Sequence, residues 1–267
     1  MGFKDLIMPS NNNASVALFD LISHEDWQLV VMECRMWPNE AKKWKLREGF
    51  FDGEHDSHVL PIHMACALQC PPEVVDTLVE CHPMGVRMRE ETFQRLPLHI
   101  ACQTNAPLET IEALIRHYPE ASRAKDCAGR LPIHYACSSH DAESVVIDLL
   151  LQAFPASAGC GDENGWLPIH VACSRGVSLY AVEMLLKYLP QSAEMATNKG
   201  STPLICARKG NSKRHNDVVR YLKDYIQRQS SMNRINRMKL EPTSTLITMG
   251  MPASTTIHHR NVAARGA

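Results

Sequence analysis

The fold of this 267-residue chain is decided by the heptapeptide Leu60-Pro61-Ile62-His63-Met64-Ala65-Cys66, which recurs along the sequence. Near-copies begin at Leu96, Leu131 and Leu167, and an altered copy begins at Thr202. The prolines of these five copies fall 36, 35, 36 and 35 residues apart. A fixed period of this length is typical of a solenoid, in which each unit buries its apolar face against its neighbours.

Each unit is predicted to contain two helices. The first begins at the proline of the heptapeptide, because proline is well tolerated in the first turn of a helix. The second is an apolar-periodic segment that closes at a further proline. In the clearest copy, residues 108–115 place apolar side chains on one helical face before Pro119. Glycine-containing turns, such as those at 126–129 and 162–165, connect one unit to the next.

This unit resembles the ankyrin repeat, whose signature is Asp-x-x-Gly-x-Thr-Pro-Leu-His-x-Ala-Ala followed by an apolar second helix. The resemblance covers roughly residues 56–228. Leucine replaces the threonine before the proline except at Thr202, and cysteine replaces the second alanine. The four repeated histidines, beginning with His63, therefore need other hydrogen-bond partners than that threonine. The resemblance implies an all-α, ankyrin-type helix-turn-helix solenoid of about six repeats with short hairpin-like turns.

The array is expected to occupy residues 15–228, with ends that differ from its middle. Extra residues occur in two places, an insertion at about 47–57 and a loop at 209–215. The parts of the array are predicted to be a degenerate first repeat at 15–55, regular repeats at 56–207 and a C-terminal cap at 208–228.

Both ends of the chain lack apolar periodicity, so residues 1–14 and 229–267 are expected to be disordered. From Arg228 onward the sequence has six Lys or Arg and one acid, so this tail is mildly basic. Its basic residues are spaced out, which favours a solvated segment over one that binds nucleic acid. Binding of nucleic acid through the tail is therefore the weaker alternative.

The ten cysteines favour a reducing compartment. Four of them, beginning with Cys66, occupy one position in successive repeats, which stack about 8–10 Å apart. Bridged cysteines need Cα atoms about 4.4–6.8 Å apart, so these thiols are expected to be free. The sequence has no secretory apolar region and no run long enough to span a membrane. A cytoplasmic or nuclear protein is therefore expected.

The repeated His-x-x-Cys pairs raise the question of a metal site. Each pair supplies two ligands, whereas zinc needs about four close together, so no metal and no cofactor are predicted. We expect buried thiols that act as small hydrophobes and histidines that bridge backbone groups between repeats. A thiol- or metal-responsive sensor is the alternative function, with Cys127 as its candidate exposed thiol. The sequence contains no catalytic motif that we recognise, so no enzyme activity is expected.

The predicted function is a non-catalytic scaffold that binds a partner protein or peptide on the concave face of the solenoid, as the resemblance implies. Turn tips and the exposed side of the first helices form that face. Trp166 is either an anchor there, since interface anchors are enriched in Trp and Arg, or it folds back over Leu131 and Leu167. An aromatic–arginine stripe would suit an acidic or amphipathic peptide. The candidate partner-binding residues are Phe93, Arg95, Arg130, Ser139, Trp166 and Arg175.

Overall fold

The chain divides into two compact units, residues 1–226 and 227–267. The helix pairs lie in the first unit, and the described part of the second unit is the end of one helix. The structure, a computed structural model, describes residues 18–50, 53–139, 144–210 and 212–240.

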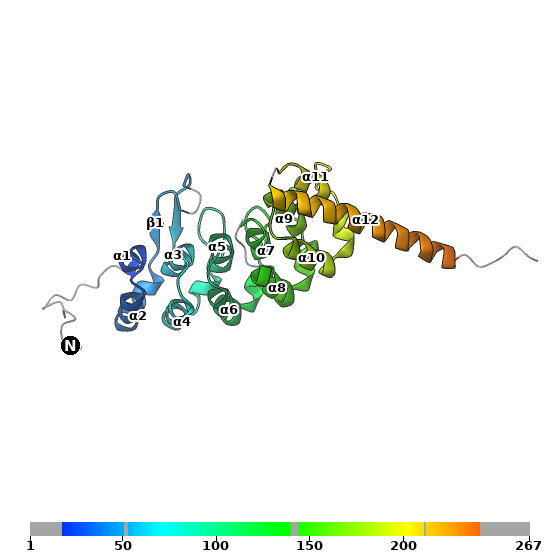
Figure 1. Cartoon of the computed structure of the whole chain (residues 1–267). Helices are drawn as coiled ribbons and strands as arrows, with labels where there is room; N and C mark the ends of the chain where they lie inside the picture. Colours follow the sequence, from blue (N-terminus) through cyan, green and yellow to red (C-terminus); the bar gives the residue numbers. More distant parts are fainter. Residues whose placement is uncertain (1–17, 51–52, 140–143, 211, 241–267) are drawn as a thin grey trace, which may run out of the picture. The chain divides into compact units, whose positions relative to one another are not determined.

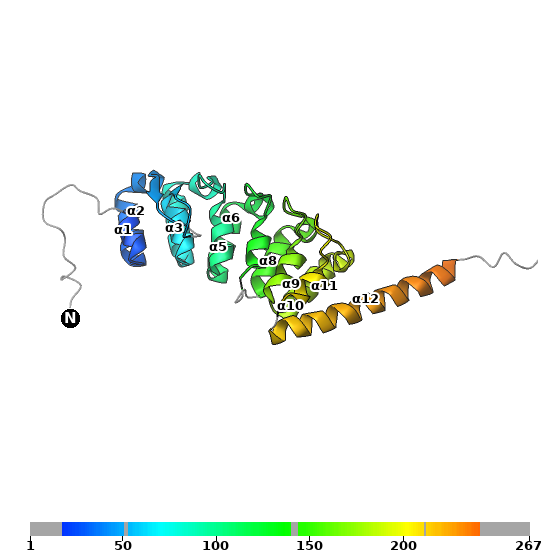
Figure 2. The same ribbon diagram turned by 90° about the horizontal axis from the view of Figure 1, so that it is seen from above.

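The first unit is built of helices stacked in two layers (Figure 1). First helices of successive repeats contact one another, and so do second helices. The view from above in Figure 2 shows α1, α3 and α5 side by side along the stack. This arrangement confirms the predicted helix-turn-helix solenoid. The first helices are α1 (Leu18–Ser23), α3 (Pro61–Ala67), α5 (Pro97–Thr104), α7 (Pro132–Ala136), α9 (Pro168–Arg175) and α11 (Pro203–Arg208). The second helices are α2 (Trp27–Met36), α4 (Pro72–Cys81), α6 (Leu108–His117), α8 (Ser144–Ala153) and α10 (Leu179–Tyr188).

A short 3-10 turn follows each second helix, a feature that the sequence did not lead us to expect. Proline lacks a backbone N–H and fixes its own φ, so it ends the α-helix and suits the first position of the tighter turn. The five turns are η1 (Pro38–Lys42), η2 (Gly85–Arg87), η3 (Pro119–Arg123), η4 (Pro155–Gly159) and η5 (Pro190–Ala193).

A single cluster of buried apolar side chains runs between the layers from Leu18 to Leu222. The predicted apolar face of α6 is part of it, since Ile111 and Leu114 are fully buried. The alanine of each heptapeptide is also buried, and its small side chain lets neighbouring helices approach closely. These alanines are Ala65, Ala101, Ala136, Ala172 and Ala207.

The repeated histidines form what we call the histidine ladder, which is His63, His99, His134 and His170. In each, Nδ1 accepts the backbone N–H of the leucine three residues earlier at 3.0–3.1 Å. Because Nδ1 is an acceptor, Nε2 carries the proton, and it donates to a carbonyl near the start of the next repeat at 2.9–3.0 Å. The expected bridging of backbone groups between repeats is confirmed. The accepting carbonyls belong to Met88, Ala124, Trp166 and Met195.

The insertion predicted at 47–57 adds a small sheet to the helical fold. Strand β1 (Lys45–Arg47) pairs antiparallel with strand β2 (Ser57–Val59). Side chains of β2 alternate buried, exposed and buried, which is the period of a half-buried strand. The backbone carbonyl of His58 accepts the N–H of Glu91 at 3.3 Å, so β2 also contacts the turn before α5.

The helix of the predicted C-terminal cap, α12 (Lys213–Leu240), begins inside the segment predicted to be a loop, residues 209–215. Its buried face includes Leu222. Nε2 of His215 lies 3.1 Å from the backbone carbonyl of Ser174 and donates to it. This hydrogen bond attaches the start of α12 to α9.

The prediction of disorder from residue 229 is wrong for residues 229–240, which continue α12. Seven of the twelve residues in segment 229–240 are Arg, Gln, Met, Lys or Leu, which are good helix formers, and no proline occurs before Pro242. A helix that has started in the cap therefore continues. The rest of the predicted tail, 241–267, and segment 1–14 lie outside the described residues.

The turns between repeats provide a matched test of glycine. Gly165 and Gly200 both have a φ of +74°, a backbone angle that residues with a side chain rarely adopt. A Cβ at Gly165 would lie 2.4 Å from Oδ1 and 2.9 Å from the backbone N of Asn198, whereas one at Gly200 would meet no atom within 4 Å. We therefore expect Gly200→Ala to cost about 1–2 kcal/mol of unfolding free energy and Gly165→Ala about 1–3 kcal/mol more. Urea unfolding followed by circular dichroism measures both, and equal losses would contradict the steric argument.

Candidate partner-binding groove

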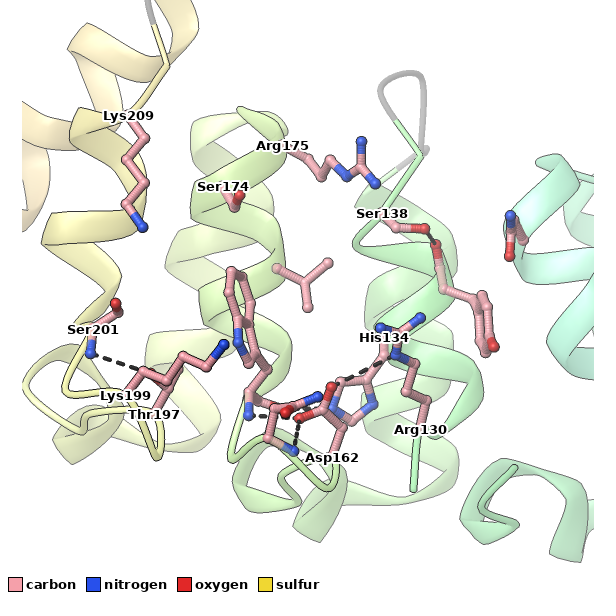
Figure 3. A pocket seen from close by; sticks show the side chains of 15 residues that line it. Arg130, His134, Ser138, Asp162, Ser174, Arg175, Thr197, Lys199, Ser201 and Lys209 are labelled. Atoms are coloured by element: carbon pink, nitrogen blue, oxygen red, sulfur yellow. Dashed lines mark hydrogen bonds and ion pairs between the residues drawn. The ribbon is translucent and has the colours of Figure 1, made fainter. Parts of the chain in front are cut away.

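A groove of about 650 Å³ lies between the turns and the first helices of the C-terminal repeats. Its residues come from α5, α7, α9, the turns that precede α7, α9 and α11, and residues just after α7 and α11 (Figure 3). The lining includes the apolar Val171 and Trp166 and the charged Arg130, Asp162, Arg175, Lys199 and Lys209.

A carboxylate builds each of the first two turns of the groove. Oδ1 of Asp126 accepts the backbone N–H groups of Ala128 at 2.9 Å and Arg130 at 2.8 Å. Oδ1 of Asp162 does the same for Asn164 at 2.9 Å and Trp166 at 2.8 Å. The turn therefore holds the backbone of Arg130 and Trp166 in place before any partner arrives.

Neighbouring turns are joined to one another by backbone hydrogen bonds. Each bond links one turn to the next, so the turns form a continuous wall along the groove. The bonds run from Cys127 N to Phe93 O at 3.0 Å, from Glu163 N to Ala128 O at 3.1 Å, and from Asn198 N to Asn164 O at 3.1 Å.

The side chain of Trp166 packs on the core and also borders the groove. Its half-buried ring packs against the core and lies edge-on to His170, with ring centres 6.2 Å apart. The same side chain lines the groove. Its backbone carbonyl accepts Nε2–H of His134 at 3.0 Å, which ties this position to the histidine ladder. Among the described residues no acceptor lies within hydrogen-bond distance of its indole N–H.

Positive charge dominates the described lining of the groove. Four cations, Arg130, Arg175, Lys199 and Lys209, face one carboxylate, Asp162. Figure 3 shows Arg175 and Lys209 on one side of the groove and Arg130 and Lys199 on the other. The Asp162 side chain is only 4% exposed, and its Oδ2 lies 3.6 Å from Nε of Arg130, which is 47% exposed.

His134 adds no charge to this site. Burial lowers the pKa of the ring, so it is neutral near neutral pH. Its Nε2–H is also occupied by the Trp166 carbonyl. The electrostatics of the groove therefore come from the arginines and lysines.

The structure brings together three of the six residues predicted to bind a partner, namely Arg130, Trp166 and Arg175. The other three do not line the groove. Ser139 is half-buried beyond the end of α7. Phe93 is half-buried, and Arg95 is only 4% exposed, which corrects its prediction as an exposed contact.

A glutamate explains why Arg95 is buried. Oε1 of Glu90 accepts the backbone N–H groups of Phe93 at 2.9 Å and Arg95 at 3.1 Å, and it lies 3.3 Å from Nε of Arg95. Burial alone would raise the pKa of Glu90, but the hydrogen bond from Ser57 and those from the turn lower it overall. Glu90 thus takes the place of the turn aspartate, and Gln94, at a φ of 58°, takes the place of the glycine.

Lys209 lines the groove, although the sequence predicts that it belongs to the loop at 209–215. Its position was readable from the repeat, because it lies six residues after the repeated proline of its unit. Gln103, Ser138 and Ser174 occupy the same position in their own units, and all three line the groove.

A second, smaller hollow of about 410 Å³ adjoins the groove. It lies beside α3 and α5 and is bounded by Arg47 and Glu48 at the end of β1. Gln103 lines both hollows, so they are neighbours. The charges of Arg47 and Glu48 cancel, in contrast to the excess of cations around Lys199 and Arg175.

The described residues give little support to a metal or thiol site. They contain no group of three or more His, Cys, Asp or Glu that could hold a metal ion. Burial raises the pKa of Cys34 to about 12, and it also raises the pKa of Cys102, Cys137 and Cys173. Even the exposed Cys127 has a raised pKa, because of desolvation and the neighbouring Asp126 carboxylate. Since the thiolate is the reactive form, these thiols are poorly suited to sensing.

The fold and the groove define a helical repeat solenoid with one preformed, positively charged hollow. A family model described as ankyrin repeats matches residues 62–154 and 142–234, which together span more than half of the chain. The chain belongs to the ankyrin-repeat family. Ankyrin repeats are generally protein–protein interaction modules, and the family is typically non-catalytic.

No curated protein matches the sequence. In the part of the chain that the structure describes, no helix has both the length and the apolar character needed to cross a bilayer.

Proposed function

We propose that this protein is a non-catalytic scaffold that holds a partner protein or peptide in the groove between α5 and α11. The observation that carries the proposal is the position of Trp166, half-buried in a hollow whose wall is fixed by hydrogen-bonded turns. Arg130 and Arg175 are proposed to contact the partner beside it, together with Lys199 and Lys209.

The physical argument is one of preorganisation. A hollow of about 650 Å³ lies within the usual range of about 300–1,000 Å³ for binding pockets. A tryptophan that is already packed on the core offers a large contact area at little cost in side-chain entropy, and such residues often dominate interface energies. Because Asp162 fixes the backbone at Trp166, the chain need not order this turn when a partner binds.

Panning of a random peptide library, displayed on phage, against the full chain tests the proposal. We expect selected peptides to bind Trp166→Ala/Arg175→Ala at least about tenfold more weakly than the native chain, since anchor residues typically contribute more than about 1 kcal/mol each. Arg175→Ala alone leaves the core intact and is expected to weaken binding by a smaller factor. Circular dichroism checks that each variant is folded.

The matched control is Tyr180→Ala/Lys187→Ala, which removes an aromatic and a cation from α10. Both side chains are exposed, and neither lines the groove. This pair is expected to leave peptide affinity unchanged. A library that yields no peptide sensitive to Trp166→Ala/Arg175→Ala or to Arg175→Ala would rule out the groove as the binding site.

We also propose a reducing compartment, the cytoplasm or the nucleus. The ten cysteines are all free thiols, and seven of them are buried. Free, buried cysteines are common where glutathione and thioredoxin keep thiols reduced. A fluorescent fusion imaged in cells would test the location.

A further inference from the structure

We infer that the partner presents an extended acidic segment, whose carboxylates lie beside an apolar side chain packed on Trp166. This inference rests on the proposed function and adds the chemistry of the partner. It depends on the charges of the groove, on how they are distributed, and on the neutral hollow beside them.

The groove has cations that nothing in its described lining neutralises. Its only described carboxylate, Asp162, is nearly buried and is used by two backbone N–H groups and by Arg130. No described carboxylate lies within ion-pair distance of Arg175, Lys199 or Lys209. The chain as a whole carries a formal charge of −1, so this excess is local.

The four cations are distributed along the groove. They extend over three successive repeats and lie on both sides of it (Figure 3), with the half-buried Val171 and Trp166 also in the lining. A single compact anion could not reach all of them. In an extended peptide, successive side chains point in opposite directions, with a rise of about 3.3 Å per residue. Carboxylates along such a peptide can therefore reach Arg130 and Lys199 on one side and Arg175 and Lys209 on the other.

The neighbouring hollow beside α3 and α5 makes the two ends of the bound segment differ in charge. Its one basic and one acidic residue, Arg47 and Glu48, cancel, and Phe50 and Met64 contribute apolar surface. We therefore place the acidic part of the segment between α7 and α11 and an uncharged part near α5. A nucleic acid would favour positive charge that continues through both hollows, but the hollow beside α3 and α5 has no net charge.

The composition of the peptides selected from the random library tests the inference. Peptides whose binding depends on Trp166 are expected to be enriched at least about twofold in Asp and Glu over the starting library. Synthetic, fluorescein-labelled copies of about 12 residues span the three repeats and report affinity to the full chain by fluorescence anisotropy. Replacement of their acids by Gln or Asn is expected to weaken binding at least about tenfold, and added salt to weaken the acidic peptides selectively.

Reversal of charges on the protein also tests whether the peptide carboxylates bind the cations of the groove. Lys199→Glu/Lys209→Glu is expected to weaken the acidic peptides at least about tenfold, because both side chains are exposed at the groove. Lys187→Glu/Lys223→Glu changes the net charge by the same amount at exposed positions outside the groove and is expected to have little effect.

The outcomes separate the two proposals. Groove-dependent peptides that are neutral or basic, or that bind equally well after the Gln and Asn replacements, would overturn the inference and leave the proposed function standing. Equal weakening by both charge-reversed pairs would show that the peptides respond to the net charge of the chain and not to the groove. This result would also overturn the inference. Groove-dependent binding of a short single-stranded DNA in preference to the acidic peptides would replace the inference with nucleic-acid binding. A library without any groove-dependent peptide removes the proposed function and the inference together.

Discussion

Lowering the pH from about 7 to about 4.5 is expected to remove several kcal/mol from the unfolding free energy of this chain. The cause is the histidine ladder, whose rings are buried in their neutral form. Burial lowers the pKa of His63 and of His99 to about 4, and it lowers the pKa of His134 and His170 as well. In the unfolded chain each ring titrates at about 6.5.

The sign of the effect follows from the order of these pKa values. Below about pH 6.5 the unfolded chain binds protons that the folded chain does not, so stability is fully present above this pH and falls as the solution becomes more acidic. The loss levels off only below the folded pKa of about 4. Each pH unit within the window costs about 1.4 kcal/mol per histidine, so His63 and His99 alone account for about 5 kcal/mol at pH 4.5.

Urea unfolding at a series of pH values, followed by circular dichroism, measures this dependence. The window of loss between about pH 6.5 and 4 distinguishes the histidines from the carboxylates, whose unfolded pKa values are near 4. An unfolding free energy that stays constant from pH 7 to 4.5 would show that the ladder rings are not held neutral.

Removal of one member of the ladder is expected to have the second large effect. His99→Ala is expected to cost about 3–5 kcal/mol at neutral pH. The ring accepts the N–H of Leu96 at 3.1 Å and donates to the carbonyls of Ala124 at 2.9 Å and Arg130 at 3.3 Å. Truncation leaves the Leu96 N–H and the Ala124 carbonyl without a partner, at about 1–3 kcal/mol for each unsatisfied group, and leaves a cavity in addition.

The matched control is His58→Ala. This side chain is half exposed on β2 and pairs with Glu91 at the surface, so its loss is expected to cost less than about 1 kcal/mol. His99→Ala should also reduce the pH dependence described above by about one proton, a change that a simple packing defect would not produce. Similar losses for the two variants, or an unchanged pH dependence in His99→Ala, would contradict the role given to the ladder.

Much of this architecture could be predicted because one proline marks the start of the first helix of each unit and another follows the second helix. Pro97 starts α5, and Pro119 ends the segment that contains α6, so the period of the prolines gives the period of the fold. The bridging histidines were predictable for a similar reason, since a buried imidazole that recurs once per unit needs one donor and one acceptor in every unit. Local chemistry repeated at a fixed spacing is the strongest signal in such a sequence.

The features that could not be predicted depend on contacts that do not repeat. Strands β1 and β2 pair across an insertion that occurs once, and three residues each are too few to show an alternating pattern. Arg95 occupies the turn position of Arg130 and Trp166, but Glu90 holds its guanidinium and Phe93 lies 4.0 Å away, measured to the ring centre. The sequence of one turn does not reveal which of two arginines is paired and buried.

The altered copy at Thr202 has a consequence for how this array could change in length. Every internal unit brings its own imidazole donor and offers a carbonyl to the unit before it, so duplication of an internal unit would conserve every bond. The last copy has Ile205 where the others have histidine, and its cap is Thr202, whose Oγ1 accepts the N–H of Ile205 at 3.4 Å. That unit receives a bond through the carbonyl of Met195 but passes none onward. The histidine bonds therefore all run from one unit to the next along the chain. The unit at Thr202 ends this series, because it accepts such a bond but has no histidine to donate one.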